Sequence, residues 1–384
     1  MSHTSRSRDP TCQKTWCVPF YSGSPFAPPF APRLSFRRRI FDWRIGTIDS
    51  YAEAPGIPVA RVQVFLPWLE FSSKEGTPSE ALLERAGICP ELLQQPDAVV
   101  PLKRVFRWIE LAGQSLGTEQ LGVRVGCVTP IEVLGPYGRI LAGALTLNQY
   151  LRQGIALYHT IVTGQTVWLS EHGNRARVNL GAPWKPGPGD CQARLNFLAI
   201  TIANIRRFAG PHWRPTELSF GFEPREPVPV DVLGDARVVD RPGQTYFEFP
   251  RLLLGLRLRQ GDQRPASGPT TAPDLLPSDL FGLVELQIAS LLPGGAPPVD
   301  LIAETLGMSR RSLQRGLASM GVRYTDLLTM VRLRRAAGWL ERTDKPVVEI
   351  ALDLGYTDAS NFTRAFRRET GASPTRFRET AGRL

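Results

Sequence analysis

The chain has 384 residues, of which 42% are hydrophobic and 21% are charged, and its formal net charge is +10. This length leaves room for two domains, and the composition is typical of a soluble globular protein. No apolar run approaches the ~18 residues of a membrane-spanning helix, and the first residues lack the apolar stretch of a secretion signal. We therefore expect a cytoplasmic protein without a membrane segment.

The cysteines and histidines show no pattern that predicts a metal site or a disulfide framework. The five cysteines are scattered, no two have Cys-x-x-Cys spacing, and the four histidines lie far apart. We expect buried or free thiols, and neither a metal ion nor another cofactor.

The positive charge is concentrated at the two ends of the chain. Residues 1–44 carry eight Lys/Arg against two acidic residues, and residues 309–384 carry fifteen against eight, which leaves −3 for the stretch between them. Residues 1–55 are rich in Ser, Arg and Pro, so we expect no regular structure there. The sequence leaves open whether this segment is a basic arm that touches DNA or a non-native extension from an upstream start codon.

Residues 56–259 are predicted to form an α+β domain. The three- and four-residue spacing of Val62, Phe65, Leu66 and Leu69 is helical. Further helices are expected over 81–86, from 102 to 116, over 140–155 and over 193–208, and strands over 162–169, 176–180, 216–222 and 243–249. The first two strands flank His172-Gly173-Asn174, which predicts a hairpin.

Residues 260–277 have the composition of a flexible linker, with a domain boundary near 272, and residues 278–384 are predicted to be all-α. The fold class expected for the whole chain is therefore mainly α. It combines an α+β N-terminal domain with an all-α C-terminal domain.

One pattern occurs twice in the C-terminal domain. Ile302-Ala303 leads to Gly307 and a second helix in the first copy, and Ile350-Ala351 leads to Gly355 and a second helix in the other. A helix, a glycine turn and a basic second helix are the elements of a helix-turn-helix unit that reads DNA. We expect a connecting helix from Tyr324 to Thr343 to hold two such units about one DNA turn, ~34 Å, apart.

The second helix of the first copy divides into an inner and an outer face. Leu313 and Leu317 are expected to pack inward, whereas Arg311, Gln314 and Arg315 form an outward stripe. Arg can contact guanine and Gln can contact adenine through paired hydrogen bonds. In the second copy, the outward positions include the short residues Ala359 and Ser360 beside Arg364.

The run Gly355 to Pro374 resembles the signature of AraC-type transcription regulators, and Ile302 to Gly321 resembles the less uniform first half of their DNA-binding domain. The resemblance implies seven helices, two helix-turn-helix units and recognition of double-stranded promoter DNA. It places three residues of each unit at base-reading positions. These are Arg311, Gln314, Arg315, Ala359, Ser360 and Arg364.

Phosphate contacts are expected from a second group of residues in both units. These are Ser309, Arg310, Arg367, Arg368 and Arg376. Because Ala359 and Ser360 are short, we expect the second unit to act mainly by holding phosphates. RNA polymerase is the further partner that a promoter-bound regulator implies.

Residues 57–259 resemble the arabinose-binding-type sensor of a subgroup that includes ornithine and arginine-catabolism regulators. The matching stretches are Ile57 to Val62, Leu121 to Gly126 and Phe220 to Phe222. The resemblance implies a small-molecule effector of unknown identity, and often a homodimer. Four aromatic residues are candidates for lining an effector pocket, and core packing is the alternative reading of each. They are Tyr137, Tyr158, His159 and Trp168.

Two alternatives remain open from the sequence. The N-terminal domain could serve only to form a dimer, without a ligand. An enzyme that repairs alkylated DNA combines a similar module with a reactive cysteine, but neither Cys127 nor Cys191 has a neighbouring His or Arg to activate it. We therefore expect no enzymatic activity.

Overall fold

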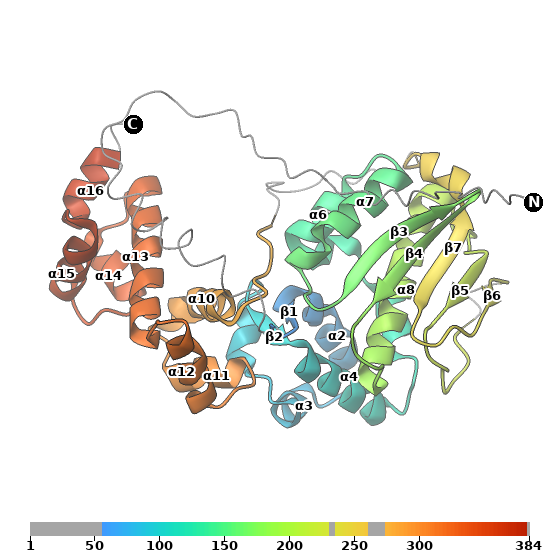
Figure 1. The fold of residues 1–384 in the computed structure, drawn as a ribbon, viewed down its shortest axis with the longest axis horizontal. Helices are drawn as coiled ribbons and strands as arrows, with labels where there is room; N and C mark the ends of the chain where they lie inside the picture. The colour runs from blue at the N-terminus through green and yellow to red at the C-terminus, as the bar shows by residue number, and fades with distance from the viewer. Residues whose placement is uncertain (1–55, 230–234, 260–272, 382–384) are drawn as a thin grey trace, which may run out of the picture. The chain divides into compact units, whose positions relative to one another are not determined.

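The computed structural model describes residues 56–229, 235–259 and 273–381 (Figure 1). The predicted basic segment 1–55 and most of the predicted linker 260–277 lie outside these ranges. Where the linker prediction overlaps them, Leu276 is buried.

The N-terminal domain combines helices and sheets, so the predicted α+β class is confirmed. Its α-helices are α2 (Val62–Lys74), α3 (Ser79–Ala86), α4 (Leu102–Leu116), α5 (Leu121–Val128), α6 (Gly135–Ala142), α7 (Leu147–Leu157) and α8 (Pro188–Ala209). The helix predicted over 140–155 is instead two helices. The break is stabilised locally, because the side chain of Thr146 accepts a hydrogen bond from the N–H of Gln149 and thereby caps the start of α7.

The strands form a small and a larger sheet. The small sheet pairs β1 (Val59–Arg61) with β2 (Val99–Pro101), a pairing that the sequence did not reveal. The larger sheet has the order β3-β4-β7-β5-β6. Its strands are β3 (Thr166–His172), β4 (Arg175–Gly181), β5 (Glu217–Ser219), β6 (Arg237–Val238) and β7 (Thr245–Pro250). The predicted hairpin is confirmed as β3 and β4, but β3 starts at Thr166 and not at Val162, and β5 is shorter than predicted.

Side-chain alternation gives the larger sheet an apolar and a polar face. Val178 of β4 and Phe247 and Phe249 of β7 are buried in one core cluster with Leu195 and Leu198 of α8. This helix lies along the sheet in Figure 1. The neighbouring positions along the same strands carry polar side chains on the opposite face.

Helix α5 packs closely against α8 because two of its residues lack side chains. A Cβ atom at Gly122 would lie 1.9 Å from the carbonyl oxygen of Gln192, and one at Gly126 would lie 2.8 Å from the Cβ of Ala199. These glycines belong to the Leu121 to Gly126 stretch that carries the family resemblance. Their spacing therefore has a packing reason.

The C-terminal domain contains seven α-helices within residues 273–381, as the family resemblance implied. They are α10 (Leu280–Leu291), α11 (Val299–Thr305), α12 (Arg310–Ser319), α13 (Tyr324–Arg342), α14 (Val347–Asp353), α15 (Ala359–Thr370) and α16 (Pro374–Ala381). No single helix in the described ranges is long and apolar enough to cross a membrane. One pair meets that criterion jointly, Leu280–Gly294 with Val299–Thr305, and it is bent by 119°.

Polar contacts join the first helices of the C-terminal domain to β2 and α4. The N–H of Val99 donates to Oε1 of Gln287 at 3.1 Å, and both residues are fully buried. The guanidinium of Arg104 donates to the backbone carbonyl of Glu304 at the end of α11, at 2.6 Å. Apolar residues of both regions belong to one buried cluster. The first helix-turn-helix unit is therefore attached to residues of the N-terminal domain.

Candidate nucleic-acid interface

The first helix-turn-helix unit consists of α11, a glycine turn and α12. Gly307 has a φ of 70°, a conformation in which glycine is not strained, and it ends the first helix as predicted. The side chain of Ser309 accepts a hydrogen bond from the N–H of Ser312 and so caps α12. Leu313 and Leu317 are fully buried, which fixes the outward direction of the rest of the helix.

The three residues predicted to read bases in this unit lie together on the exposed face of α12. Arg311, Gln314 and Arg315 are all exposed. Within the described part of the chain, their side chains make no hydrogen bond or ion pair. Their donors and acceptors are therefore available to DNA.

The two residues of the first unit that are expected to bind phosphates, Ser309 and Arg310, lie at the start of the same helix. Arg310 forms an exposed ion pair with Asp300, at 3.0 Å. An exposed pair of this kind contributes little stability, so a phosphate can replace the carboxylate at low cost. Ser309 is exposed as well, although its hydroxyl also contacts that of Ser312.

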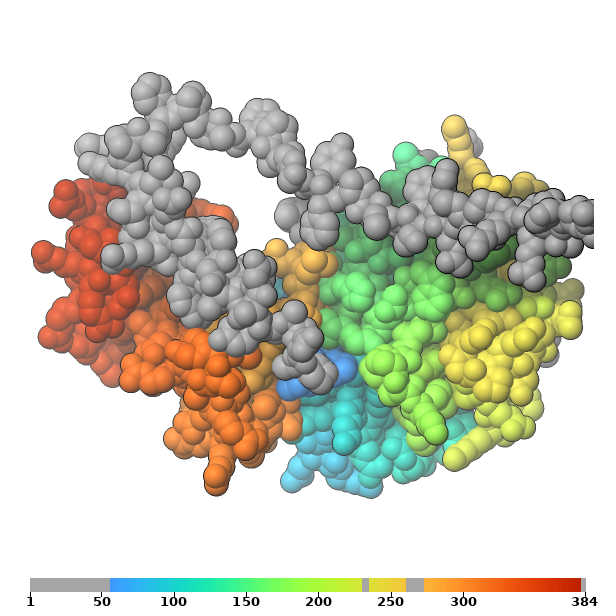
Figure 2. Space-filling view, viewed as in Figure 1, coloured from blue at the N-terminus to red at the C-terminus, as the bar shows by residue number. Residues whose placement is uncertain are grey.

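The second unit consists of α14, the turn at Gly355 and α15. The side chain of Asp358 accepts a hydrogen bond from the N–H of Asn361 at 2.7 Å and caps α15. Phe362 and Phe366 are fully buried and lie 5.5 Å apart between ring centroids. Helices α12 and α15 belong to the orange and red surface in Figure 2.

The outer face of α15 differs from that of α12. Ala359 is partly buried and Ser360 is exposed. Arg364 is exposed, but its guanidinium donates to the side-chain oxygen of Asn361 at 2.6 Å. The base-reading candidates of this unit are therefore shorter than those of α12 or held by a neighbour.

Three further arginines extend the exposed positive surface of the second unit. Arg367 and Arg376 are exposed, and their side chains make no contact of hydrogen-bond or ion-pair type within the described ranges. Among the described residues, Arg368 forms an ion pair with its neighbour Glu369, at 2.8 Å, and its side chain is 71% exposed.

Arginines of the connecting helix α13 are used inside the domain. Arg332 donates to the carbonyl of Gly355, Arg335 donates to the carbonyl of Ala289 at 2.7 Å, and Arg334 pairs with Glu285. These contacts tie the helix to both ends of the domain. The positive charge of α13 therefore serves packing, which the sequence did not reveal.

The four aromatic candidates for an effector pocket occupy different environments. Tyr137 and Tyr158 are buried in the core, and burial raises the pKa of both hydroxyl groups. His159 is exposed, and Trp168 is 44% exposed on the outer side of β3. The two tyrosines lie in one core cluster. None of the four residues is among those that line the two cavities described below.

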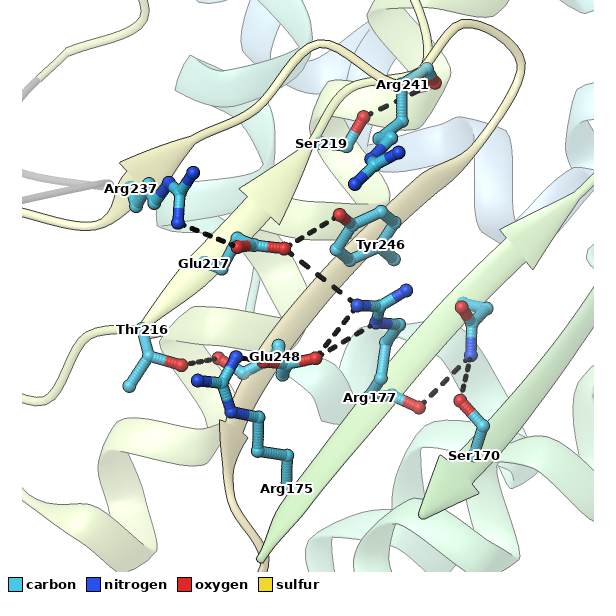
Figure 3. Close-up of polar contacts among 11 residues, drawn as sticks. Ser170, Arg175, Arg177, Thr216, Glu217, Ser219, Arg237, Arg241, Tyr246 and Glu248 are labelled. Atoms are coloured by element: carbon cyan, nitrogen blue, oxygen red, sulfur yellow. Dashed lines mark hydrogen bonds and ion pairs between the residues drawn. The ribbon is translucent and has the colours of Figure 1, made fainter. Parts of the chain in front are cut away.

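The polar face of the larger sheet carries a charged network that the sequence analysis missed (Figure 3). Glu248 lies between Arg175 and Arg177, with N–O distances of 2.7 and 2.9 Å. Arg177 also lies over the ring of Tyr246, at 4.0 Å, and Tyr246 donates to Glu217. Arg175 and Arg177 are two residues apart on β4, and Tyr246 and Glu248 are two residues apart on β7. This spacing places each pair on one face of its strand, and it was the signal in the sequence that could have revealed the network.

A larger and a smaller cavity are found on the described part of the N-terminal domain. The larger, of about 450 Å³, lies between α7, the β3–β4 hairpin and the 3₁₀ turn η5 (Arg251–Gly255). The smaller, of about 160 Å³, lies at the start of α8 and includes Cys191. Burial raises the pKa of the Cys191 thiol to about 11, so this thiol is protonated and poorly nucleophilic at neutral pH.

Comparison with family models finds two matches in this chain. Residues 302–380 match a helix-turn-helix domain, and residues 76–257 match the N-terminal arabinose-binding domain of AraC transcription regulators.

Curated relatives match over most of their length. The chain is 36% identical to the regulator VqsM of Pseudomonas aeruginosa over 292 residues, which cover 72% of this chain and 88% of that one. It is 27% identical to the ornithine utilization regulator of the same organism, over 84% of this chain and 96% of that one. It is 29% identical to VirS of Mycobacterium tuberculosis, over 78% and 90% of the two chains.

Solved structures with a similar chain include the transcriptional regulator CdpR of Pseudomonas aeruginosa. It is 20% identical, covers 79% of this chain and 96% of its own, and has a TM-score of 0.34. The DNA-binding domain of AdpA, solved with a target DNA, is 28% identical over 27% of this chain and 88% of its own, with a TM-score of 0.24.

Proposed function

The chain belongs to the AraC family of DNA-binding transcription regulators and carries an arabinose-binding-type N-terminal domain, and we propose that a small-molecule effector held by that domain controls how the C-terminal domain binds promoter DNA. The curated relatives are regulators, in keeping with a chain that acts by binding rather than by catalysis.

One observation carries the proposal for DNA recognition. Arg311, Gln314 and Arg315 share the exposed face of a capped helix, and none of them is engaged by the rest of the described chain. Their chemistry suits guanine and adenine edges in the major groove. In this proposal, Ser309 and Arg310 contact phosphates beside them and set the register of the helix on the duplex.

The second unit is proposed to hold the DNA with less sequence preference. Ala359, Ser360 and Arg364 face the bases, and two of these side chains are short. The exposed Arg367, Arg368 and Arg376 are proposed to bind phosphates, which adds affinity without base discrimination.

A selection experiment tests this proposal. The full chain is used to enrich duplexes from a random library, and its affinity for the enriched sequence is compared with a scrambled duplex of equal base composition across a salt titration. We expect preference for the enriched site, two protected major-groove segments about 34 Å apart, and a steep fall of affinity with salt. Equal affinity for both duplexes at every salt concentration would contradict sequence-specific recognition.

Effector control is tested separately by thermal melting of the full chain. The ligand panel contains amino acids, opines and aromatic acids, and it includes ornithine because one relative is an ornithine utilization regulator. A ligand at 100 times its Kd should stabilise the protein by about 2.7 kcal/mol. A uniformly silent panel would favour the alternative in which the N-terminal domain serves only for dimer formation.

Two partners complete the proposal. We propose a homodimer formed through the N-terminal domain, to be tested by sedimentation of the full chain with and without DNA. RNA polymerase is the proposed partner at the promoter in the cytoplasm, to be tested by transcription from the selected site with purified polymerase.

A further inference from the structure

The larger cavity of the N-terminal domain has the chemistry of a site for a small carboxylic acid. Its polar wall is made by Arg152 of α7, Glu171 of β3 and Arg251 of η5. Arg152 Nη2 donates to Glu171 Oε1 at 3.1 Å, and Arg251 Nε donates to Glu171 Oε2 at 2.6 Å. One carboxylate thus holds two guanidinium groups, and the three side chains together carry a charge of +1.

Both arginines retain donors after these contacts. A guanidinium has five N–H groups in a flat fork that matches a carboxylate. Arg152 uses one more of them on the side chain of Asn148, at 2.9 Å. A bound carboxylate therefore finds donors that are already oriented by Glu171, and it neutralises the remaining positive charge.

The lining of the cavity also includes apolar side chains. They are Leu252 and Leu254, and Leu252, at 72%, is the most exposed of the large apolar side chains in the described residues. The cavity is open to solvent on one side, and its volume of about 450 Å³ is large enough for a small molecule. A ligand with a carboxylate at one end and an aliphatic chain at the other would contact both the charged and the apolar lining residues.

The cavity also lies where the chain leaves the N-terminal domain. Directly after η5, the carbonyl of Leu256 accepts a hydrogen bond from the N–H of Leu147 at 2.9 Å, and the N–H of Leu258 donates to the carbonyl of Leu145 at 2.9 Å. The exit segment 256–258 is thus paired with the start of α7, the helix that supplies Arg152. A ligand that joins α7 to η5 would hold this exit segment in place.

We propose that this cavity is the effector site and that its ligand is a small aliphatic carboxylic acid, bound by Arg152 and Arg251 and packed against Leu252. The regulatory half of this inference rests on the proposed function, whereas the binding half does not.

Calorimetric titration of the full chain with hexanoate tests the binding half. We expect hexanoate to bind at least ten-fold more tightly than hexanamide, which lacks the charge, and than acetate or inorganic phosphate, which lack the chain. Equal binding of hexanamide, or of phosphate, would overturn the proposed ligand class, and so would the absence of hexanoate binding.

Variants of the chain locate the site. Arg152→Gln and Arg251→Gln should each weaken hexanoate binding about ten-fold or more, because each removes a charge-assisted contact. Arg225→Gln is the matched control, since Arg225 is an exposed arginine paired with Glu119 at 3.3 Å beside the other cavity. Its affinity should remain within two-fold of that of the unaltered chain, and loss in all three variants would overturn the assignment.

A filling variant tests the cavity without changing charge. Gly255 lines it, and a Cβ atom there would meet nothing within 4 Å, so Gly255→Leu should fold normally and abolish hexanoate binding. Retained binding in this variant, with unchanged melting temperature, would place the ligand elsewhere.

The regulatory half is measured on the selected DNA. Hexanoate should change the affinity of the unaltered chain for that DNA by about five-fold or more, and it should have no effect on Gly255→Leu. If hexanoate binds but the affinity for DNA is unchanged, regulation through this site is contradicted, whereas the binding site itself is supported. An absence of DNA preference would instead contradict the proposed function.

Discussion

Arg332 donates from its Nη2 to the backbone carbonyl of Gly355, at 2.9 Å. The contact joins the connecting helix α13 to the turn of the second helix-turn-helix unit. The same guanidinium lies over the ring of Tyr356, at 4.7 Å. This one side chain therefore contributes two contacts that orient the second unit on the connecting helix.

We predict that Arg332→Met loosens the second unit. The variant loses a hydrogen bond from a charged donor and a cation–π contact, so the free energy of unfolding should fall by about 1–3 kcal/mol. Amide exchange measured by mass spectrometry should accelerate over residues 355–358. Arg342→Met, an exposed position on the same helix, is the control and should change neither quantity. Unchanged exchange in Arg332→Met would contradict a positioning role.

Two glycines with the same φ of 72° should respond differently to alanine. A Cβ atom at Gly355 would lie 2.6 Å from the backbone nitrogen of Ala296, whereas one at Gly321 would meet nothing within 4 Å. Gly321→Ala should cost about 1–2 kcal/mol of unfolding free energy from backbone strain alone. Gly355→Ala should cost more, as measured by urea denaturation. Equal losses of unfolding free energy in the two variants would show that the backbone at Ala296 moves away from the added Cβ atom without a cost.

Base reading and phosphate binding should separate in affinity measurements. Arg315→Ala should lose about 1–3 kcal/mol of discrimination at one base position of the selected site. Arg368→Ala should weaken binding to the selected and scrambled duplexes about equally and reduce the salt dependence. A uniform loss in Arg315→Ala would reassign that residue to the phosphates.

The contact between Val99 and Gln287 predicts an effect on one backbone amide. Gln287→Met keeps a similar volume but removes the acceptor of the buried Val99 N–H. Amide exchange measured by NMR should accelerate at Val99 by about ten-fold or more, because an unpaired buried N–H costs about 1–3 kcal/mol. The neighbouring buried amide of Ala98, which donates to the carbonyl of Gln95, is the internal control.

The charged network on the sheet predicts a pH effect with a defined sign. Burial acts to raise the pKa of Glu248, but hydrogen bonds from Arg175 and Arg177 outweigh it and hold that pKa below its ordinary value. The stabilisation is therefore complete above the ordinary carboxyl pKa of ~4.3, and it is lost as the pH falls through the folded-state pKa.

Glu248→Gln should accordingly destabilise the protein at pH 7, and the difference from the unaltered chain should shrink towards pH 3. Urea denaturation across this pH range measures it. Glu341→Gln, an exposed acidic position on α13, is the control and should give a smaller difference at pH 7. A difference for Glu248→Gln that grows with falling pH would contradict a lowered pKa.

Local patterns predicted the helix-turn-helix units in detail. The spacing of Leu313 with Leu317 and the two glycine turns depend on residues a few positions apart. The same periodicity predicted that Arg311, Gln314 and Arg315, the candidates for base reading, face outward from α12. Where local signals were weaker, as between α6 and α7, the element boundaries were wrong.

By itself, the sequence thus determined the two-domain class, the repeated units and the outward residues of α12, because helical periodicity and capping are local properties. Only the tertiary structure decided which arginines of α13 serve packing, that β7 lies between β4 and β5, and that Arg152, Glu171 and Arg251 share one cavity. These arrangements join segments far apart in the chain. Their register is set by which apolar faces pack together, and no spacing within a single element contains that information.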